Sequence, residues 1–180
     1  MEIRGYFKLN KMKIQITLNT EDTIKIELYP EIAPKTVENF IKLVRAGYYE
    51  NTAFHRIIKG FMIQTGGYKI ENNTLLELGD VPTINGEFAS NGFKNELKHE
   101  LGVISMARTS DPNSATSQFF ICAGTATWLD GEYAAFGRTI DEESNEVILK
   151  IASVPTMNIG GGFSDFPTFD IKIIDIKEIE

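Results

Sequence analysis

The sequence holds one cysteine and two histidines, and this scarcity limits the chemistry that it can support. A single thiol forms no internal disulfide, and Cys122 lies between apolar residues in QFFICAG, so we expect a small buried hydrophobe rather than a nucleophile. A metal site needs several closely placed ligands, and the only His and Cys side chains are His55, His99 and Cys122. We therefore predict no metal and no other cofactor.

Basic residues are in the minority. The chain carries 18 Lys and Arg against 25 Asp and Glu, which gives a net charge of -7 and a pI near 5.0. Broad binding to nucleic acid or to an anionic membrane needs clustered Lys and Arg, so the charge disfavours both, and peptides or proteins are the expected partners. No apolar signal segment occurs in MEIRGYFKLNKM and no run approaches membrane-spanning length, so we expect a cytoplasmic protein.

Motifs for bond-making catalysis are also missing. No G-x-S-x-G elbow occurs, although the two histidines leave a Ser–His–acid hydrolase open. IGGGFSDF lacks the Lys-Ser/Thr that follows the glycines of a phosphate-binding loop, so a surface loop is the better interpretation. The carboxylates are scattered, and none is marked as half of an acid–base pair.

What is present is enough for one domain with a sizeable core. The chain has 180 residues, of which 42% are hydrophobic, and 12 Phe suit a packed β core or an apolar cavity. Residues 1–11 show no clear periodicity, and regular patterning begins at Met12. We therefore predict an N-terminal extension over 1–11 and a single domain over 12–180.

Hydrophobic periodicity predicts many short strands and two helices. KIQITL and TIKIEL alternate on either side of NTED, which is typical of a hairpin. Val37, Phe40, Ile41 and Val44 have helical spacing within PKTVENFIKLVRAG, and a second apolar stripe spans Glu142 to Ala152. Further strands are predicted in FHRII, FMIQT, GVISMA, SQFFICA, YAAFGRT and FDIKIIDIKEI, and a long polar stretch is predicted from about residue 66 to residue 100.

The closing strand should contain a bulge, because its alternation changes phase at Ile173 and Ile174. Many short strands with only two helices favour a mainly β fold, an antiparallel barrel capped by the helices.

FHRIIKGFMIQTGG, residues 54–67, places Arg56 inside an apolar run. Strand alternation would put Phe54, Arg56 and Ile58 on one side and His55 and Ile57 on the other. An arginine in such a place usually covers apolar surface with its methylene stem or pairs with a distant carboxylate. Taken alone, the stretch favours a structural role for Arg56.

Three motifs change that interpretation. FHRIIKGFMIQTGG, ISMARTSDPNSATSQFFI and WLDGEYAAFG resemble, in order and spacing, those of the cyclophilin family of peptidyl-prolyl cis-trans isomerases. The likeness extends from about Met12 to Glu180, since the hairpin, the PKTVENF helix and the closing strand also fit. The resemblance implies an eight-stranded antiparallel β-barrel with a helix over each end, and a rotamase that assists protein folding.

The resemblance also implies an active-site groove in which Arg56 is the catalytic residue. The substrate-binding residues would be Phe61, Met62, Gln64, Ala107, Arg108, Thr109, Gln118, Phe120, Trp128, Leu129 and Tyr133. Arg108 and Thr109 stand in an Ala-Asn-Ala-like segment that the family uses largely through its main chain, and Tyr133 stands where many members have His. The Gly-Thr-Gly-Gly-like stretch before GEF is missing, which leaves the residue preference beside the proline open.

The mechanism expected from this resemblance needs no nucleophile, metal or proton transfer. In the rotated transition state the prolyl nitrogen carries a localised lone pair, and a donor aimed at it binds that state better than the planar ground states. Arg56 would be this donor, because its guanidinium is permanently charged.

A proline-peptide binding or chaperone-like module with little turnover is the alternative. Loss of Arg56 or of the pocket aromatics would indicate it, and the sequence keeps both. We expect proline-containing peptides and proteins as partners and a monomer in solution, and the presence of Trp128 implies inhibition by cyclosporin.

Overall fold

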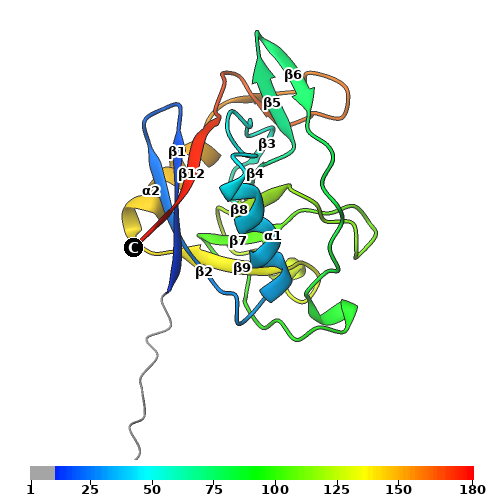
Figure 1. The fold of residues 1–180 in the computed structure, drawn as a ribbon. Helices are drawn as coiled ribbons and strands as arrows, with labels where there is room; N and C mark the ends of the chain where they lie inside the picture. Colours follow the sequence, from blue (N-terminus) through cyan, green and yellow to red (C-terminus); the bar gives the residue numbers. More distant parts are fainter. Residues whose placement is uncertain (1–10) are drawn as a thin grey trace, which may run out of the picture.

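Eight strands form one curled antiparallel sheet in the computed structural model (Figure 1). The structure describes residues 11–180, so the predicted extension over 1–11 lies outside the described residues except for Lys11. The strands follow the order β12-β1-β2-β9-β7-β8-β4-β3. Their bounds are β1 (Met12–Leu18), β2 (Thr23–Leu28), β3 (Arg56–Ile58), β4 (Met62–Thr65), β7 (Val103–Met106), β8 (Phe119–Cys122), β9 (Ala135–Thr139) and β12 (Ile173–Ile179).

The β1–β2 hairpin follows from its alternating sequence. Ile14 pairs with Ile26 and Ile16 pairs with Ile24, and all four side chains are fully buried. The intervening polar residues lie on the other face, where they are only partly covered. The predicted hairpin is therefore confirmed, with its register fixed by the buried isoleucines.

Backbone hydrogen bonds also join the two edge regions of the curled sheet. The N–H of Asn51 donates to the carbonyl of Ile173 at 2.7 Å, and that of Phe54 donates to Ile171 at 2.9 Å. The register of β12 against β1 shifts beside Ile174, whose side chain is exposed while Ile171 and Ile173 are buried. The bulge predicted at Ile173 and Ile174 is confirmed, and the mainly β, barrel-like fold with it.

Two helices pack on the sheet and complete one main core. In α1 (Pro34–Arg45) the buried residues include Phe40, and in α2 (Glu142–Ala152) they include Ile148. The two helices end where the sequence predicts. The buried carboxylate of Glu87 binds the first turn of α1. Its Oε1 accepts hydrogen bonds from the N–H and the hydroxyl of Thr36 at 2.6 and 2.7 Å. The bond from the backbone satisfies one free N–H at the helix N-terminus.

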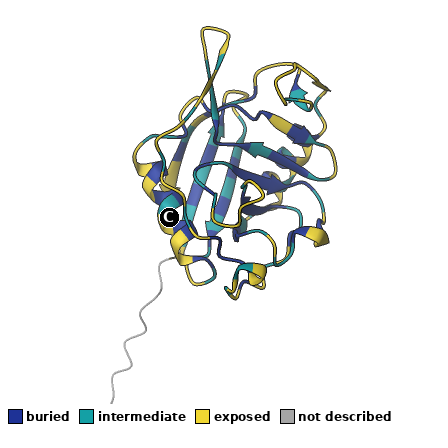
Figure 2. Ribbon diagram, turned by 90° about the vertical axis from the view of Figure 1, so that its right-hand side faces the viewer, coloured by how far each residue is buried: buried dark blue, intermediate teal, exposed yellow. Residues whose placement is uncertain are grey.

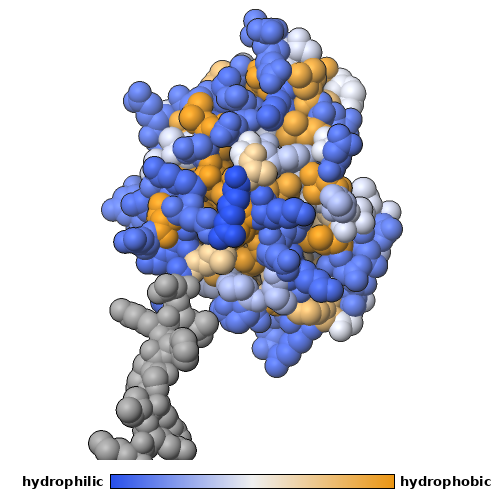
Figure 3. All heavy atoms as spheres, in the orientation of Figure 1, coloured by the Kyte–Doolittle hydropathy of each residue, from blue (hydrophilic) through white to orange (hydrophobic). Residues whose placement is uncertain are grey.

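Buried residues lie between the sheet and the helices, and exposed ones lie on turns and outer helix faces (Figure 2). On the face that carries α1, hydrophilic side chains cover most of the surface, with smaller apolar areas between them (Figure 3). No helix among residues 11–180 is long and apolar enough to cross a membrane.

The structure differs from the sequence prediction between residues 66 and 100. A small hairpin, β5 (Tyr68–Glu71) and β6 (Thr74–Glu77), projects from the body of the molecule there (Figure 1). Asn72 and Asn73 form its turn with φ angles of 50° and 58°, which asparagine tolerates better than most residues. A short 3-10 turn, η1 (Ala89–Asn91), and a ladder of β10 (Thr156–Met157) with β11 (Phe166–Pro167) were also not predicted.

The FHRII segment also forms less strand than its pattern predicts. Regular pairing begins only at Arg56, so Phe54 does not share a face with it. Phe54 is instead fully buried in the main core, because the chain before β3 pairs with residues 171–173 rather than with β4 alone. Arg56 remains exposed.

Candidate active site

One cavity of about 210 Å³ collects most of the predicted site residues. Its walls come from the β3–β4 hairpin, from β8, from the chain after β7 and from the segment that leads into β9. The lining residues are Arg56, Phe61, Met62, Gln64, Ala107, Arg108, Phe120, Leu129 and Tyr133. Nine of the twelve predicted positions therefore lie on one groove, although they span 78 sequence positions from 56 to 133.

The β3–β4 hairpin presents Arg56 to this groove. Its turn contains Gly60 in the left-handed region with φ 74°, and Arg56 pairs with Gln64 in the ladder. The guanidinium Nη1 donates to Gln64 Oε1 at 3.4 Å, and Gln64 Nε2 donates to Gln118 Oε1 at 3.0 Å. No ion pair among residues 11–180 involves Arg56. Two amides thus orient an exposed and unneutralised cation.

A second apolar cluster, separate from the main core, forms the floor of the groove. It contains Met62, Phe120 and Leu129, with Phe61 and Tyr133 packed against it. Strand β8 divides the two clusters, because Phe119 enters the main core and its neighbour Phe120 enters the floor. A ring placed on this floor would meet sulfur, aromatic and aliphatic surface, which suits an apolar substrate group.

Three predicted residues stand beside the groove rather than on its wall. Gln118 accepts a hydrogen bond from Gln64, as described above. Trp128 in η2 (Thr127–Leu129) is 63% exposed and tilts against Phe61 with ring centroids 5.4 Å apart, so it forms a rim. Thr109 turns into its own loop, where its N–H and hydroxyl donate to Ser114 Oγ at 3.0 and 2.8 Å.

The side chain of Arg108 lines the groove, although the family resemblance predicts a role mainly for the main chain of this segment. Its guanidinium lies over the rings of Phe88 and Tyr133, at 4.9 and 4.5 Å from their centroids. Nε and Nη2 both donate to the carbonyl of Glu132, at 3.2 and 2.7 Å. These contacts hold the cation at the groove in a fixed position.

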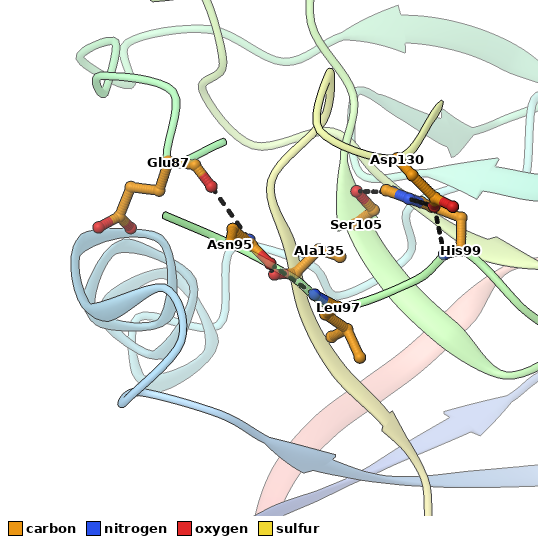
Figure 4. A network of polar contacts seen from close by, with 7 residues as sticks. All are labelled: Glu87, Asn95, Leu97, His99, Ser105, Asp130 and Ala135. Carbon is orange, nitrogen blue, oxygen red and sulfur yellow. Dashed lines mark hydrogen bonds and ion pairs between the residues drawn. The ribbon is translucent and has the colours of Figure 1, made fainter. Parts of the chain in front are cut away.

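A buried polar network lies beneath the groove (Figure 4). The ring of His99 bonds to Asp130 through Nδ1 at 3.0 Å and to Ser105 Oγ through Nε2 at 2.9 Å. The same ring stacks near Phe120 with centroids 6.1 Å apart and planes 20° apart. Burial lowers the pKa of His99 in spite of the adjacent Asp130, so the ring is neutral at pH 7.

This network has the residue types of a hydrolytic triad but not its accessibility. Ser105 is fully buried in β7, so no substrate carbonyl reaches its hydroxyl. His99 instead links Asp130, at the end of η2, to Ser105 in β7. Separately, Asn95 Nδ2 donates to the carbonyls of Glu87 and Ala135 at 3.0 and 2.9 Å (Figure 4). Sequence reasoning missed the network, because its members come from separate segments and no local pattern marks them.

His55 precedes Arg56 in the chain, does not line the groove and is almost fully buried. Its ring meets Tyr68 edge-on at 4.8 Å, and its Nδ1 has no hydrogen-bond partner among the described residues. Burial lowers the pKa of His55 to about 4. The folded protein therefore resists protonation of this ring.

We expect this resistance to make stability depend on pH. Between about pH 6.5 and 4 the unfolded chain binds a proton at residue 55 that the folded chain excludes, so stability falls as the pH falls through this window. The loss between pH 7.5 and 5 is about 2 kcal/mol from His55 alone. Urea unfolding of the wild type and of His55→Gln at both pH values measures it, and the variant should lose less stability than the wild type. Equal losses in the two proteins would contradict this account.

The groove places an oriented cation above an apolar floor, and sequence comparison identifies the family of the chain. Residues 13–178 match the family described as cyclophilin type peptidyl-prolyl cis-trans isomerase/CLD. A peptidyl-prolyl cis-trans isomerase-like 1 of Emericella nidulans is 37% identical over 171 residues, which cover 94% of this chain and 97% of the relative. The isomerase cypE of Dictyostelium discoideum is 41% identical over 161 residues, covering 88% and 94%.

Solved structures agree with this assignment. A Cryptosporidium parvum cyclophilin type peptidyl-prolyl cis-trans isomerase superposes with a TM-score of 0.74 at 31% identity, covering 94% of this chain and 98% of that one. A second structure of that protein, in the presence of the dipeptide Ala-Pro, also gives 0.74, at 32% identity and with 93% and 99% covered. The chain belongs to the cyclophilin family and is a peptidyl-prolyl cis-trans isomerase.

Proposed function

We propose that this isomerase rotates X-Pro bonds in peptide and protein substrates by donating a hydrogen bond from Arg56 to the prolyl nitrogen, and that it assists protein folding. The observation that carries the proposal is an exposed guanidinium that forms no ion pair within residues 11–180 and is oriented by Gln64 beside an apolar floor. This arrangement offers a charged donor next to a surface that suits a proline ring.

The reaction needs such a donor because amide resonance creates the barrier. Rotation about a peptide bond costs about 18–20 kcal/mol, and uncatalysed X-Pro relaxation takes tens of seconds or more. At the perpendicular geometry the nitrogen lone pair is localised and accepts a hydrogen bond that the planar amide nitrogen accepts poorly. Only an interaction that is stronger in the transition state accelerates the step.

Arg56 supplies part of the acceleration. A hydrogen bond from a charged donor contributes about 1.5–3 kcal/mol, which corresponds to about 10- to 100-fold in rate. The floor formed by Met62, Phe120 and Leu129 supplies more by holding the ring against an apolar surface while the preceding carbonyl turns.

The structure of the Cryptosporidium relative in the presence of the dipeptide Ala-Pro supports proline-containing ligands for this groove as well. We also propose that cyclosporin inhibits this chain at the rim formed by Trp128 and Phe61, and that the protein acts as a monomer in the cytoplasm. These three proposals stay predictions; titration with cyclosporin, sedimentation and cell fractionation test them in turn.

Exchange NMR on a short Ala-Pro peptide tests the proposed function. Wild-type protein at catalytic concentration should accelerate cis–trans exchange by orders of magnitude over the uncatalysed rate, and an excess of cyclosporin should suppress it. Binding without acceleration would indicate the alternative, a proline-peptide module with little turnover. Absence of both would overturn the proposal.

A further inference from the structure

The groove carries two cations and no carboxylate. Arg56 and Arg108 both line it, and the other seven lining residues are uncharged. Two other arginines of the described chain have acidic partners: Arg45 bonds to Glu178 at 2.7 Å and Arg138 to Glu100 at 3.2 Å. Among residues 11–180 no ion pair includes Arg56 or Arg108. In a chain with 25 acidic residues, the groove is thus a local site of uncompensated positive charge.

The guanidinium of Arg108 is held in place but not saturated. A guanidinium has five N–H bonds, and three of those of Arg108 are used, two on the carbonyl of Glu132 and one on its neighbour Thr109 at 2.9 Å. The Glu132 carboxylate forms no ion pair with it among residues 11–180, and its Oε2 accepts a hydrogen bond from Ser90 Oγ at 2.8 Å. The other two N–H bonds have no acceptor among residues 11–180, so they can bind a ligand.

Aromatic contacts make this donor set rigid. The rings of Phe88 and Tyr133 lie 4.9 and 4.5 Å from the guanidinium carbon. A cation that is already fixed loses little conformational freedom when it binds an anion, and a carboxylate matches the planar geometry of a guanidinium.

We propose that Arg108 makes this groove selective for substrates with an acidic side chain, Asp or Glu, within two residues of the proline. The inference rests on the proposed function, because it names the substrate class of the same groove. Arg108 is the specificity-determining residue, while Arg56 adds positive charge to the same groove.

The net charge of the protein would by itself produce the opposite preference among substrates. At -7 the molecule as a whole repels acidic peptides and attracts basic ones. Long-range attraction alone therefore ranks substrates in the order Lys, Gln, Glu, from best to worst. Selection by Arg108 predicts the reverse order, so the sign of the preference separates the two effects.

The test measures kcat/KM by exchange NMR for proline peptides that place Glu, Gln or Lys in turn at each of the two positions before the proline and each of the two positions after it. At one or more positions we expect Glu to exceed Gln by about threefold to tenfold, as for a partly exposed charge pair. The ratio should shrink at high salt, because the pair is accessible to screening. Equal rates for Glu and Gln at every position, or a preference for Lys, would overturn the inference.

Two variants assign the effect to Arg108. In Arg108→Gln the Glu/Gln ratio should fall to about one, whatever the absolute rate of the variant. Arg45→Gln changes the net charge by the same unit at a site outside the groove, and it should keep the wild-type ratio. An unchanged ratio in Arg108→Gln, or an equal fall in Arg45→Gln, also overturns the inference. The outcomes differ from failure of the proposed function, in which no peptide of the series is accelerated.

Discussion

Replacing Arg56 by alanine is expected to lower kcat/KM for an Ala-Pro peptide by about 10- to 100-fold. The variant loses the charged donor to the prolyl nitrogen, while the apolar floor of Met62, Phe120 and Leu129 stays in place. Peptide affinity should therefore change less than the rate. Exchange NMR gives the rate, and chemical-shift titration of the same samples gives the affinity.

Stability serves as the internal control for this variant. Arg56 is exposed, and its only side-chain hydrogen bond among the described residues is the one of 3.4 Å to Gln64, so the free energy of unfolding should stay within about 0.5 kcal/mol of wild type. Arg56→Lys keeps the charge but not the planar fork and should fall between alanine and wild type. Rates equal to wild type in Arg56→Ala would remove Arg56 from the mechanism.

Hydrophobic periodicity predicts the regular strands and helices of this fold, because the apolar residues that form the periodic pattern are the ones that the fold buries. Ile14, Ile16, Ile24 and Ile26 establish the first hairpin locally, and the stripe of α2 predicts the observed bounds of Glu142–Ala152. The bulge near Ile174 is equally local, since two adjacent isoleucines cannot face one side of a strand. Such features need no knowledge of the rest of the chain.

The parts that were missed depend on contacts between distant segments. Phe54 leaves the pattern of its strand because residues 171–173 pair with the chain before β3. The turn at Asn72 and Asn73 is a local signal, but it lies in a polar stretch without the alternation that identifies a strand. The pairing of His99 with Asp130 joins residues 31 positions apart, and no spacing rule connects them.

The groove also combines features that are local in the sequence with contacts between distant segments. Periodicity places Arg56 on a strand but gives no reason to bring it to Arg108, Phe120 or Tyr133, and the resemblance of three motifs supplied that grouping. The resemblance transfers main-chain roles well, since these depend on the fold. It gives no position for the Arg108 side chain, which two rings and two carbonyls of this chain hold in place.

Alanine substitutions at the neighbouring Phe119 and Phe120 of β8 are expected to have different effects on stability and on peptide affinity. Phe119→Ala should lower the free energy of unfolding by about 3–5 kcal/mol, because it opens a cavity in a fully buried part of the main core. The lost ring packs edge-on against Phe40 and Tyr49, with centroids 5.4 and 5.3 Å away. For a domain of this size the change corresponds to a fall in Tm of about 6–20 °C.

Phe120→Ala is the matched variant, since it removes the same atoms one residue further along the strand. Phe120 belongs to the smaller cluster at the groove floor, and its other face lines the cavity. We expect a smaller loss of stability, and a peptide affinity at least about tenfold weaker because the surface that receives the ring is gone.

Urea unfolding and chemical-shift titration at a temperature where both variants are folded separate the two effects. If Phe119→Ala weakened the peptide affinity of the folded protein as much as Phe120→Ala does, the division of β8 between core and groove would be wrong. A tenfold difference between adjacent residues would instead show that the alternation of a single strand separates stability from substrate binding.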